Sequence, residues 1–156
     1  MSAPAPAPLR LLVPVDGSED AAAAVEEAIR RGGAVPLHAH LLHVQAGMMA
    51  DELVAHLPQK AVDAWYAREG GDALAAAAAR LQAAGVPHTV HRLSGPVVET
   101  IVEQCRALGC DAIVMGTRGR GRLLGALLGS VAAGVAGRVP VPVTLVKAGP
   151  PPDAAA

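Results

Sequence analysis

Apolar residues along the chain gather into short runs, separated by longer segments of helical character. Runs rich in Leu, Val and Ile predict β-strands at residues 9–16, 37–44, 87–93, 111–116 and 141–147. The intervening segments predict helices at residues 18–31, 61–84, 97–108 and 130–138, and a Gly-Gly pair at 70–71 predicts an interruption or kink in the second. Strands that alternate with helices indicate an α/β fold with a parallel sheet and helices on both faces.

The first run, residues 9–16, is apolar on both faces until Asp16, which is typical of a central strand buried on both sides. Pro14 lacks an amide donor, so we expect it near the end of that strand, where pairing stops. Asp16 and Gly116 each end a predicted strand. Ligands of such sheets bind beyond the carboxyl ends of the strands, where the strand order switches direction. A switch between the first and fourth strands would bring Asp16 and Gly116 together.

Composition restricts the classes of function. The chain has 156 residues, 52% of them hydrophobic, with no Phe and a net charge of −1. We expect one domain at residues 9–148, between a disordered Ala/Pro leader (1–8) and a disordered tail (149–156). The charge argues against a nucleic-acid partner, and the uncharged stretch 123–137 is too short to span a membrane. Cys105 and Cys110 are too few for a disulfide framework and indicate a reducing, cytoplasmic location.

A glycine motif follows the fourth predicted strand. Gly116 and Gly119 lie at its end, and Gly129-Ser130 opens the last predicted helix, with Ser130 where an N-cap hydroxyl is expected. Glycines allow a backbone to turn sharply and approach a ligand, and the free amides of a helix N-terminus bind anions. The motif therefore predicts a phosphate site and a bound nucleotide. The same glycines could instead serve tight turns alone, and Asp16 could be a plain turn residue.

The sequence offers no catalytic or metal-binding constellation. It contains no Gly-x4-Gly-Lys-Ser/Thr motif, and no nucleophile and base can be paired from it. His38 and His40 share one face of a strand and His43 takes the other, so the three cannot meet one metal ion. Arg118 lies within the glycine loop, either as a solvated side chain or as a partner of the terminal phosphate.

These residues resemble the universal stress protein family from position 9 to 147. The specific signal is Gly-x2-Gly-x9-Gly-Ser, matched without change of spacing by Gly116, Gly119, Gly129 and Ser130. Residues 13–18 (Val-Pro-Val-Asp-Gly-Ser), 42–44, 111–116 and 140–143 (Pro-Val-Pro-Val) match in the same order. The resemblance implies a Rossmann-like five-stranded parallel sheet of order 3-2-1-4-5. It also implies a homodimer formed through the last strand.

Family members that carry this motif resemble ATP binders, so the resemblance implies ATP, with or without Mg²⁺, as the ligand. It implies that Pro14, Val15 and Asp16 border the adenine and ribose, that the Val44 backbone meets the adenine, and that Gly129, Ser130 and Val131 contact phosphate. The full set of expected nucleotide-binding residues is Pro14, Val15, Asp16, Val44, Met115, Gly116, Gly119, Gly129, Ser130 and Val131.

Three functional hypotheses follow. The first is a non-enzymatic, nucleotide-responsive stress-response regulator in the cytoplasm, whose bound ATP alters a surface read by a protein partner. The second is a slow Mg²⁺-dependent ATPase or phosphotransferase that uses Asp16. The third is a dimeric interaction module whose pocket stays empty.

Overall fold

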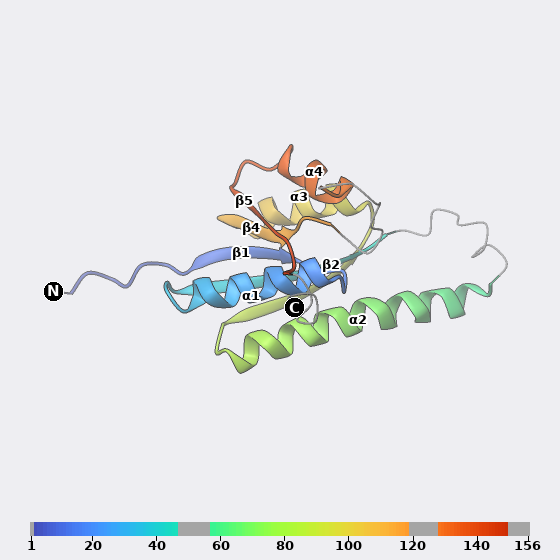
Figure 1. Cartoon of the computed structure of the whole chain (residues 1–156), viewed down its shortest axis with the longest axis horizontal. Helices are drawn as coiled ribbons and strands as arrows, with labels where there is room; N and C mark the ends of the chain where they lie inside the picture. The colour runs from blue at the N-terminus through green and yellow to red at the C-terminus, as the bar shows by residue number, and fades with distance from the viewer. Residues whose placement is uncertain (1, 47–56, 119–127, 150–156) are drawn as a thin grey trace, which may run out of the picture.

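A single parallel sheet forms the centre of the molecule. The computed structural model describes residues 2–46, 57–118 and 128–149 (Figure 1). The strand order is β3-β2-β1-β4-β5, with every pairing parallel, which confirms the predicted sheet. The strands are β1 (Leu9–Pro14), β2 (Leu37–Gln45), β3 (His88–Ser94), β4 (Ala112–Gly116) and β5 (Val143–Val146).

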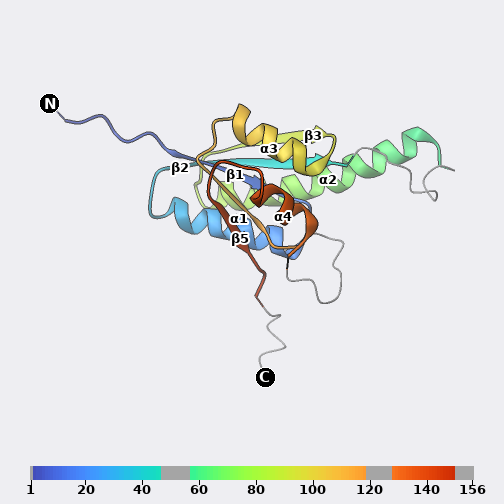
Figure 2. The same cartoon turned by 90° about the horizontal axis from the view of Figure 1, so that it is seen from above.

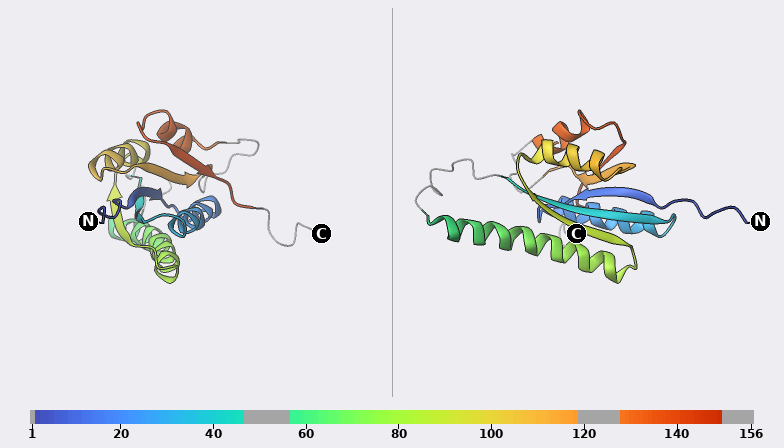
Figure 3. Two further views of the ribbon diagram at one scale, coloured as in Figure 1. Left: turned by 90° about the vertical axis from the view of Figure 1, so that its left-hand side faces the viewer. Right: turned by 180° about the vertical axis from the view of Figure 1, so that it is seen from behind.

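Helices cover both faces of this sheet. They are α1 (Glu19–Gly32), α2 (Gln59–Ala83), α3 (Val97–Ala107) and α4 (Ser130–Ala136). Figures 2 and 3 show α1 and α2 on one face and α3 and α4 on the other. Within the described ranges, no helix combines the length and the hydropathy needed to cross a bilayer.

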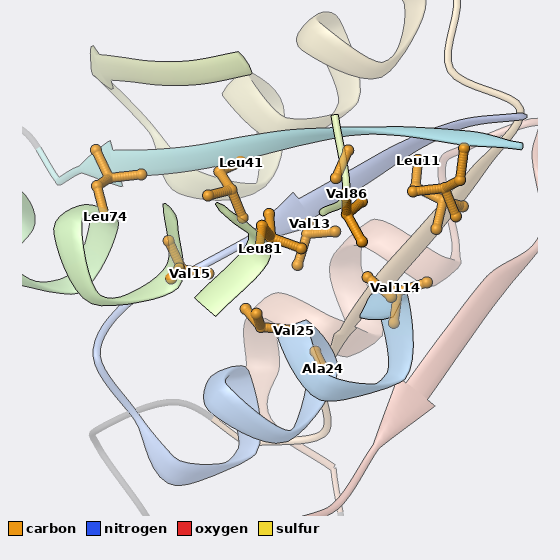
Figure 4. Packing of buried hydrophobic residues seen from close by; sticks show 14 of the residues in the cluster. Leu11, Val13, Val15, Ala24, Val25, Leu41, Leu74, Leu81, Val86 and Val114 are labelled. Carbon is orange, nitrogen blue, oxygen red and sulfur yellow. The ribbon is translucent and has the colours of Figure 1, made fainter. Parts of the chain in front are cut away.

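The central strand β1 explains why its sequence is apolar on both faces. Leu11, Leu12 and Val13 are all fully buried. Leu11 and Val13 pack in the cluster formed with α1 and α2, whereas Leu12 packs in the cluster formed with α3 and α4. Figure 4 shows the first of these clusters between the sheet, α1 and α2. Because the sheet is covered on both sides, its central strand β1 is apolar on both faces where it is buried.

The expected interruption of α2 is wrong, because the helix is continuous from Gln59 to Ala83. Gly70 and Gly71 instead allow close approach of side chains from the sheet. A Cβ on Gly70 would lie 2.4 Å from Cδ2 of His43, and one on Gly71 would lie 2.5 Å from a guanidinium nitrogen of Arg92. The glycines therefore reflect packing of α2 against β2 and β3, and neither ends the helix.

The other boundaries differ from the predicted ones by a few residues. β1 ends at Pro14, two residues earlier than predicted, and the Val15 amide still donates to the Leu42 carbonyl at 2.8 Å. β5 is shorter at both ends than the predicted strand 141–147, and α4 ends at Ala136 rather than at 138. None of these differences moves a predicted site residue to another part of the fold.

Candidate functional site

A cavity of about 480 Å³ lies beyond the carboxyl ends of β1, β2 and β4. β1 and β4 are neighbours although three helices and two strands separate them in sequence, so the strand order switches direction between them. The cavity extends from this switch point towards the first turns of α3 and α4. Open parallel sheets bind ligands at this position.

The ends of the strands provide an apolar surface. Pro14 and Val15 come from the end of β1, Val44 from β2 and Met115 from β4, and all four line the cavity. Val15 and Met115 are buried, at 6% and 5% exposure. Apolar residues at this position suit the face of a purine base, whose stacking requires no polar partner.

The turn after β1 provides a carboxylate. Gly17 has φ 82°, a left-handed conformation that favours glycine, and this turn leads directly into α1. The Ser18 amide donates to Oδ1 of Asp16 at 2.9 Å, and Ser18 Oγ accepts from the Ala21 amide at 3.1 Å as the N-cap of α1. Asp16 is thus a turn residue as well as a lining residue of the cavity. The two roles are compatible because the hydrogen bond of the turn uses one carboxylate oxygen, Oδ1.

Gly116 is required by packing of β4 against α1. A Cβ built on it would lie 2.7 Å from Cβ of Asp20 and 2.8 Å from the Asp20 carbonyl carbon. This contact is independent of any ligand. A tight turn does not by itself explain the glycine at 116, and neither does close approach to a ligand. The glycine brings the first turn of α1 against the edge of the cavity that Gly116 lines.

The two halves of the glycine motif meet at their base. The Gly129 amide donates to the Thr117 carbonyl at 2.7 Å, and the Thr117 amide donates to the Val146 carbonyl of β5 at 3.0 Å. Because its amide already has this partner, Gly129 is less suited to bind phosphate through that group than the two amides that follow it. Gly119 lies outside the described residues.

The expected capping role of Ser130 is wrong. The N-cap of α4 is Gly129, in an extended conformation (φ −71°, ψ 158°), and Ser130 is the first helical residue. An extended backbone is what an N-cap position requires, and Gly129 already occupies that position. Ser130 and Val131 nevertheless line the cavity, where first-turn amides lack partners within the helix. The structure therefore brings together every predicted site residue that it describes.

Several lining residues were missed by the sequence prediction of the site. Val97 and Ile101, four residues apart on α3, close the apolar side of the cavity. Their helical spacing was visible in the sequence, but the face they present depends on how α3 packs. Arg118, for which the sequence allowed either a solvated side chain or a phosphate partner, also lines the cavity, and its Nε is buried with no hydrogen-bond partner among the described residues. An unpaired guanidinium nitrogen beside a cavity suits an anionic ligand.

A histidine cluster lies away from this cavity, across β2 and β3. Nδ1 of His40 lies 3.0 Å from Nε2 of His91, and Nε2 of His38 lies 2.8 Å from Oγ1 of Thr89. Burial, together with the neighbouring imidazoles, lowers the pKa of His40 to about 4. His43 lies on the opposite face, where Nδ1 approaches the Val15 carbonyl at 2.8 Å. No group of three His, Cys, Asp or Glu among the described residues is arranged to hold a metal ion.

A second cavity, of about 380 Å³, lies between α1 and α2, and half of its lining residues are alanines. Of the residues that the structure describes, only Val15 and the turn that follows it connect this cavity with the strand ends. We refer to it as the α1–α2 groove. Among the described residues of the glycine motif, none lines this groove.

Fold and cavity together define an open, doubly wound α/β domain whose ligand site lies at the switch point between β1 and β4. The sequence profile of the universal stress protein family matches residues 9–147, and the chain belongs to that family. No curated protein sequence matches it.

Solved structures share the fold. Universal stress protein UspA from Lactobacillus plantarum superposes with a TM-score of 0.77 at 23% identity, covering 90% of this chain and 99% of that one. A universal stress protein in complex with cAMP has a TM-score of 0.68 at 25% identity, with 90% and 98% covered. An Arabidopsis thaliana family protein with AMP bound has a TM-score of 0.67 at 20% identity, with 94% and 97% covered.

Proposed function

We propose that the chain binds an adenine nucleotide, ATP in particular, in the cavity at the switch point. The observation that carries this proposal is the convergence of both halves of the glycine motif with the ends of β1, β2 and β4 on one cavity of about 480 Å³. That volume lies within the range of about 300–1,000 Å³ that is usual for small-molecule sites. Membership of the universal stress protein family, and a relative of 25% identity in complex with cAMP, also favour an adenine nucleotide.

The proposed pose follows the chemistry of the lining residues. The base lies on the apolar surface made by Val15, Val44 and Met115, and the Val44 backbone meets its edge. Pro14 and Asp16 border the base and the ribose. The phosphates point towards the first turn of α4, where the amides of Ser130 and Val131 and the Ser130 hydroxyl donate to them. Mg²⁺, if it accompanies the triphosphate, would find a carboxylate in Asp16.

The free energy of nucleotide binding requires contributions from several of these groups together. A micromolar complex requires about 8 kcal/mol, whereas a helix dipole contributes about 0.3–1 kcal/mol for an anion. Hydrogen bonds to charged oxygens contribute about 1.5–3 kcal/mol each. Two or three donors at α4, together with contact between the base and the apolar surface, supply the required free energy. The Arg118 guanidinium would strengthen the binding of a longer phosphate chain.

The test is calorimetric titration of ATP into the wild-type protein and into Gly129→Glu, which places a carboxylate beside the proposed phosphate position. We expect the substitution to weaken binding at least tenfold, about 1.4 kcal/mol. Gly137→Glu is the matched control, because it makes the same change at the exposed far end of α4. Equal affinity of wild type and Gly129→Glu would contradict the proposal. Titration with AMP and cAMP under the same conditions ranks the ligands.

We further propose that nucleotide binding serves regulation in the cytoplasm, with a homodimer formed through β5 and a protein partner that reads the bound state. β5 is the last strand in the sheet order, so one of its edges is available for pairing with a second copy. Sedimentation velocity with and without ATP tests the dimer. A monomer under both conditions at high concentration would contradict this part of the proposal.

A further inference from the structure

Asp20 is a fully buried carboxylate, at 0% exposure, in the first turn of α1. Its Oδ2 accepts from the Thr117 hydroxyl at 2.8 Å and from the Arg118 amide at 3.2 Å. Its Oδ1 accepts from the Ala148 amide at 2.9 Å. One side chain thus joins the residues that follow β4 to the residues that follow β5.

Burial makes these contacts costly to break. A buried charge is tolerated only when it is well hydrogen-bonded, so removal of one donor penalises the conformation that buries the carboxylate. Gly116 allows α1 to lie directly against this position, since a Cβ there would lie 2.7 Å from Cβ of Asp20. The close packing of β4 against the first turn of α1 therefore keeps the carboxylate beside the end of β4.

The two donors to Oδ2 named above belong to the wall of the cavity, whereas the Ala148 amide that donates to Oδ1 does not. Thr117 and Arg118 both line the cavity, and the Thr117 carbonyl accepts from Gly129 at the base of the glycine motif. Ala148 lies beyond β5 and is not a lining residue. The Thr117 amide also donates to Val146 at the end of β5, so two hydrogen-bond routes connect β5 to the same cavity wall.

We propose that Asp20 is a positioning residue that couples the nucleotide cavity to the segment leaving β5. This inference rests on the proposed function, and it adds a regulatory route to it. While the backbone at Ala148 is docked on Oδ1, the carboxylate holds Thr117 and Arg118 in the geometry that binds nucleotide. Displacement of that segment weakens nucleotide binding, and bound nucleotide stabilises the docked segment by the same factor, because linkage between two binding equilibria is reciprocal.

The first experiment compares Ala148→Pro, which removes the donating N–H, with Ala148→Gly, which retains it. Calorimetric titration with ATP is expected to give at least a fivefold weaker complex for Ala148→Pro than for Ala148→Gly, with Ala148→Gly close to wild type. Thermal unfolding of both variants checks that the fold is intact. A merely structural role for Asp20 would lower the melting temperature and leave the two affinities equal.

The second experiment uses the wild type alone, so it does not depend on a variant that folds. Saturating ATP is expected to slow hydrogen exchange of the Ala148 amide by at least fivefold, as reciprocity requires. Wild-type binding with equal affinities for the two Ala148 variants, or with unchanged exchange at Ala148, would overturn the coupling and leave the nucleotide site standing. Absence of ATP binding by the wild type would overturn the proposed function and the coupling with it.

Discussion

Substitution of Gly116 by alanine tests whether packing of β4 against α1 fixes the edge of the nucleotide cavity. The added Cβ would lie 2.7 Å from Cβ of Asp20 and 2.8 Å from its carbonyl carbon, whereas ordinary contact begins at 3.4 Å. One element must therefore shift by about 0.7 Å. The obstructing atoms belong to the start of a helix and cannot rotate aside as a long side chain would.

Overpacking of this kind costs about 1–3 kcal/mol. Alanine also restricts the unfolded chain, which offsets about 0.4–1 kcal/mol where the backbone angles suit it. We therefore expect Gly116→Ala to lower the free energy of unfolding by about 1–2 kcal/mol. Because Gly116 and Thr117 line the cavity, the same shift should weaken ATP binding.

Urea unfolding followed by circular dichroism measures this change. Gly33→Ala is the matched control, since Gly33 has helical angles (φ −74°, ψ −19°) and its added Cβ would meet nothing closer than 3.4 Å. That variant should be as stable as the wild type or more stable by about 0.4–1 kcal/mol. If Gly116→Ala behaves like Gly33→Ala, then packing against α1 is not the reason for glycine at 116.

Three further predictions concern the cap of α4, the packing of α2 against β2 and the histidine cluster. Ser130→Ala should weaken ATP binding by about 1 kcal/mol or more. It should change the free energy of unfolding by no more than about 0.5 kcal/mol, because the Ser130 hydroxyl is not the helix cap. Calorimetry measures the first effect and urea unfolding the second, and a loss of stability without a loss of affinity would contradict the assignment of Ser130 to the nucleotide site. Gly70→Ala should lower the melting temperature, because the added Cβ would lie 2.4 Å from Cδ2 of His43 and would push the ring aside. An unchanged melting temperature would show that the ring moves freely. Burial lowers the pKa of His40 in the folded state to about 4, from 6.5 for an ordinary histidine. The unfolded state therefore takes up the proton first, so the free energy of unfolding is at its full value above pH 6.5 and falls as the pH is lowered towards 4. The loss reaches about 3 kcal/mol, at 1.36 kcal/mol for each unit of pKa difference. The difference between the urea midpoints at pH 7 and pH 4.5 should be smaller for His40→Phe than for the wild type. An equal difference in the two proteins would refute this.

The sheet and most of the cavity were predictable because they follow from local patterns. Continuous apolar runs identified the buried strands, and the family resemblance supplied their order. Strand ends that are neighbours in a parallel sheet share one edge, so Asp16 and Gly116 came together as predicted. Periodicity and topology are sufficient for this level of detail.

The sequence predictions were wrong at positions where tertiary contacts or backbone conformation determine the residue. The Gly-Gly pair in α2 indicated a break, but Gly70 is needed for contact with His43 from β2. Ser130 was assigned to the cap because serine is favoured there, yet Gly129 adopts the extended backbone that defines the position. Neither contact nor backbone angle can be read from residue types alone.

Two features were missed because they join segments distant in sequence. An acid such as Asp20 in the first turn of a helix is usually explained by the helix dipole and exposed to solvent, whereas here it is buried against β4 and β5. The pairing of His40 with His91 depends on the register of β2 against β3. Both require the packed fold.

Titration of the isotopically labelled protein with ATP, followed by amide NMR, tests the central claim most directly. The account predicts that the largest shifts occur at Val44, Met115, Ser130 and Val131, around the cavity at the switch point, and that Ala76 in the α1–α2 groove is unaffected. Shifts confined to the α1–α2 groove, or no shifts at millimolar ATP, would contradict it.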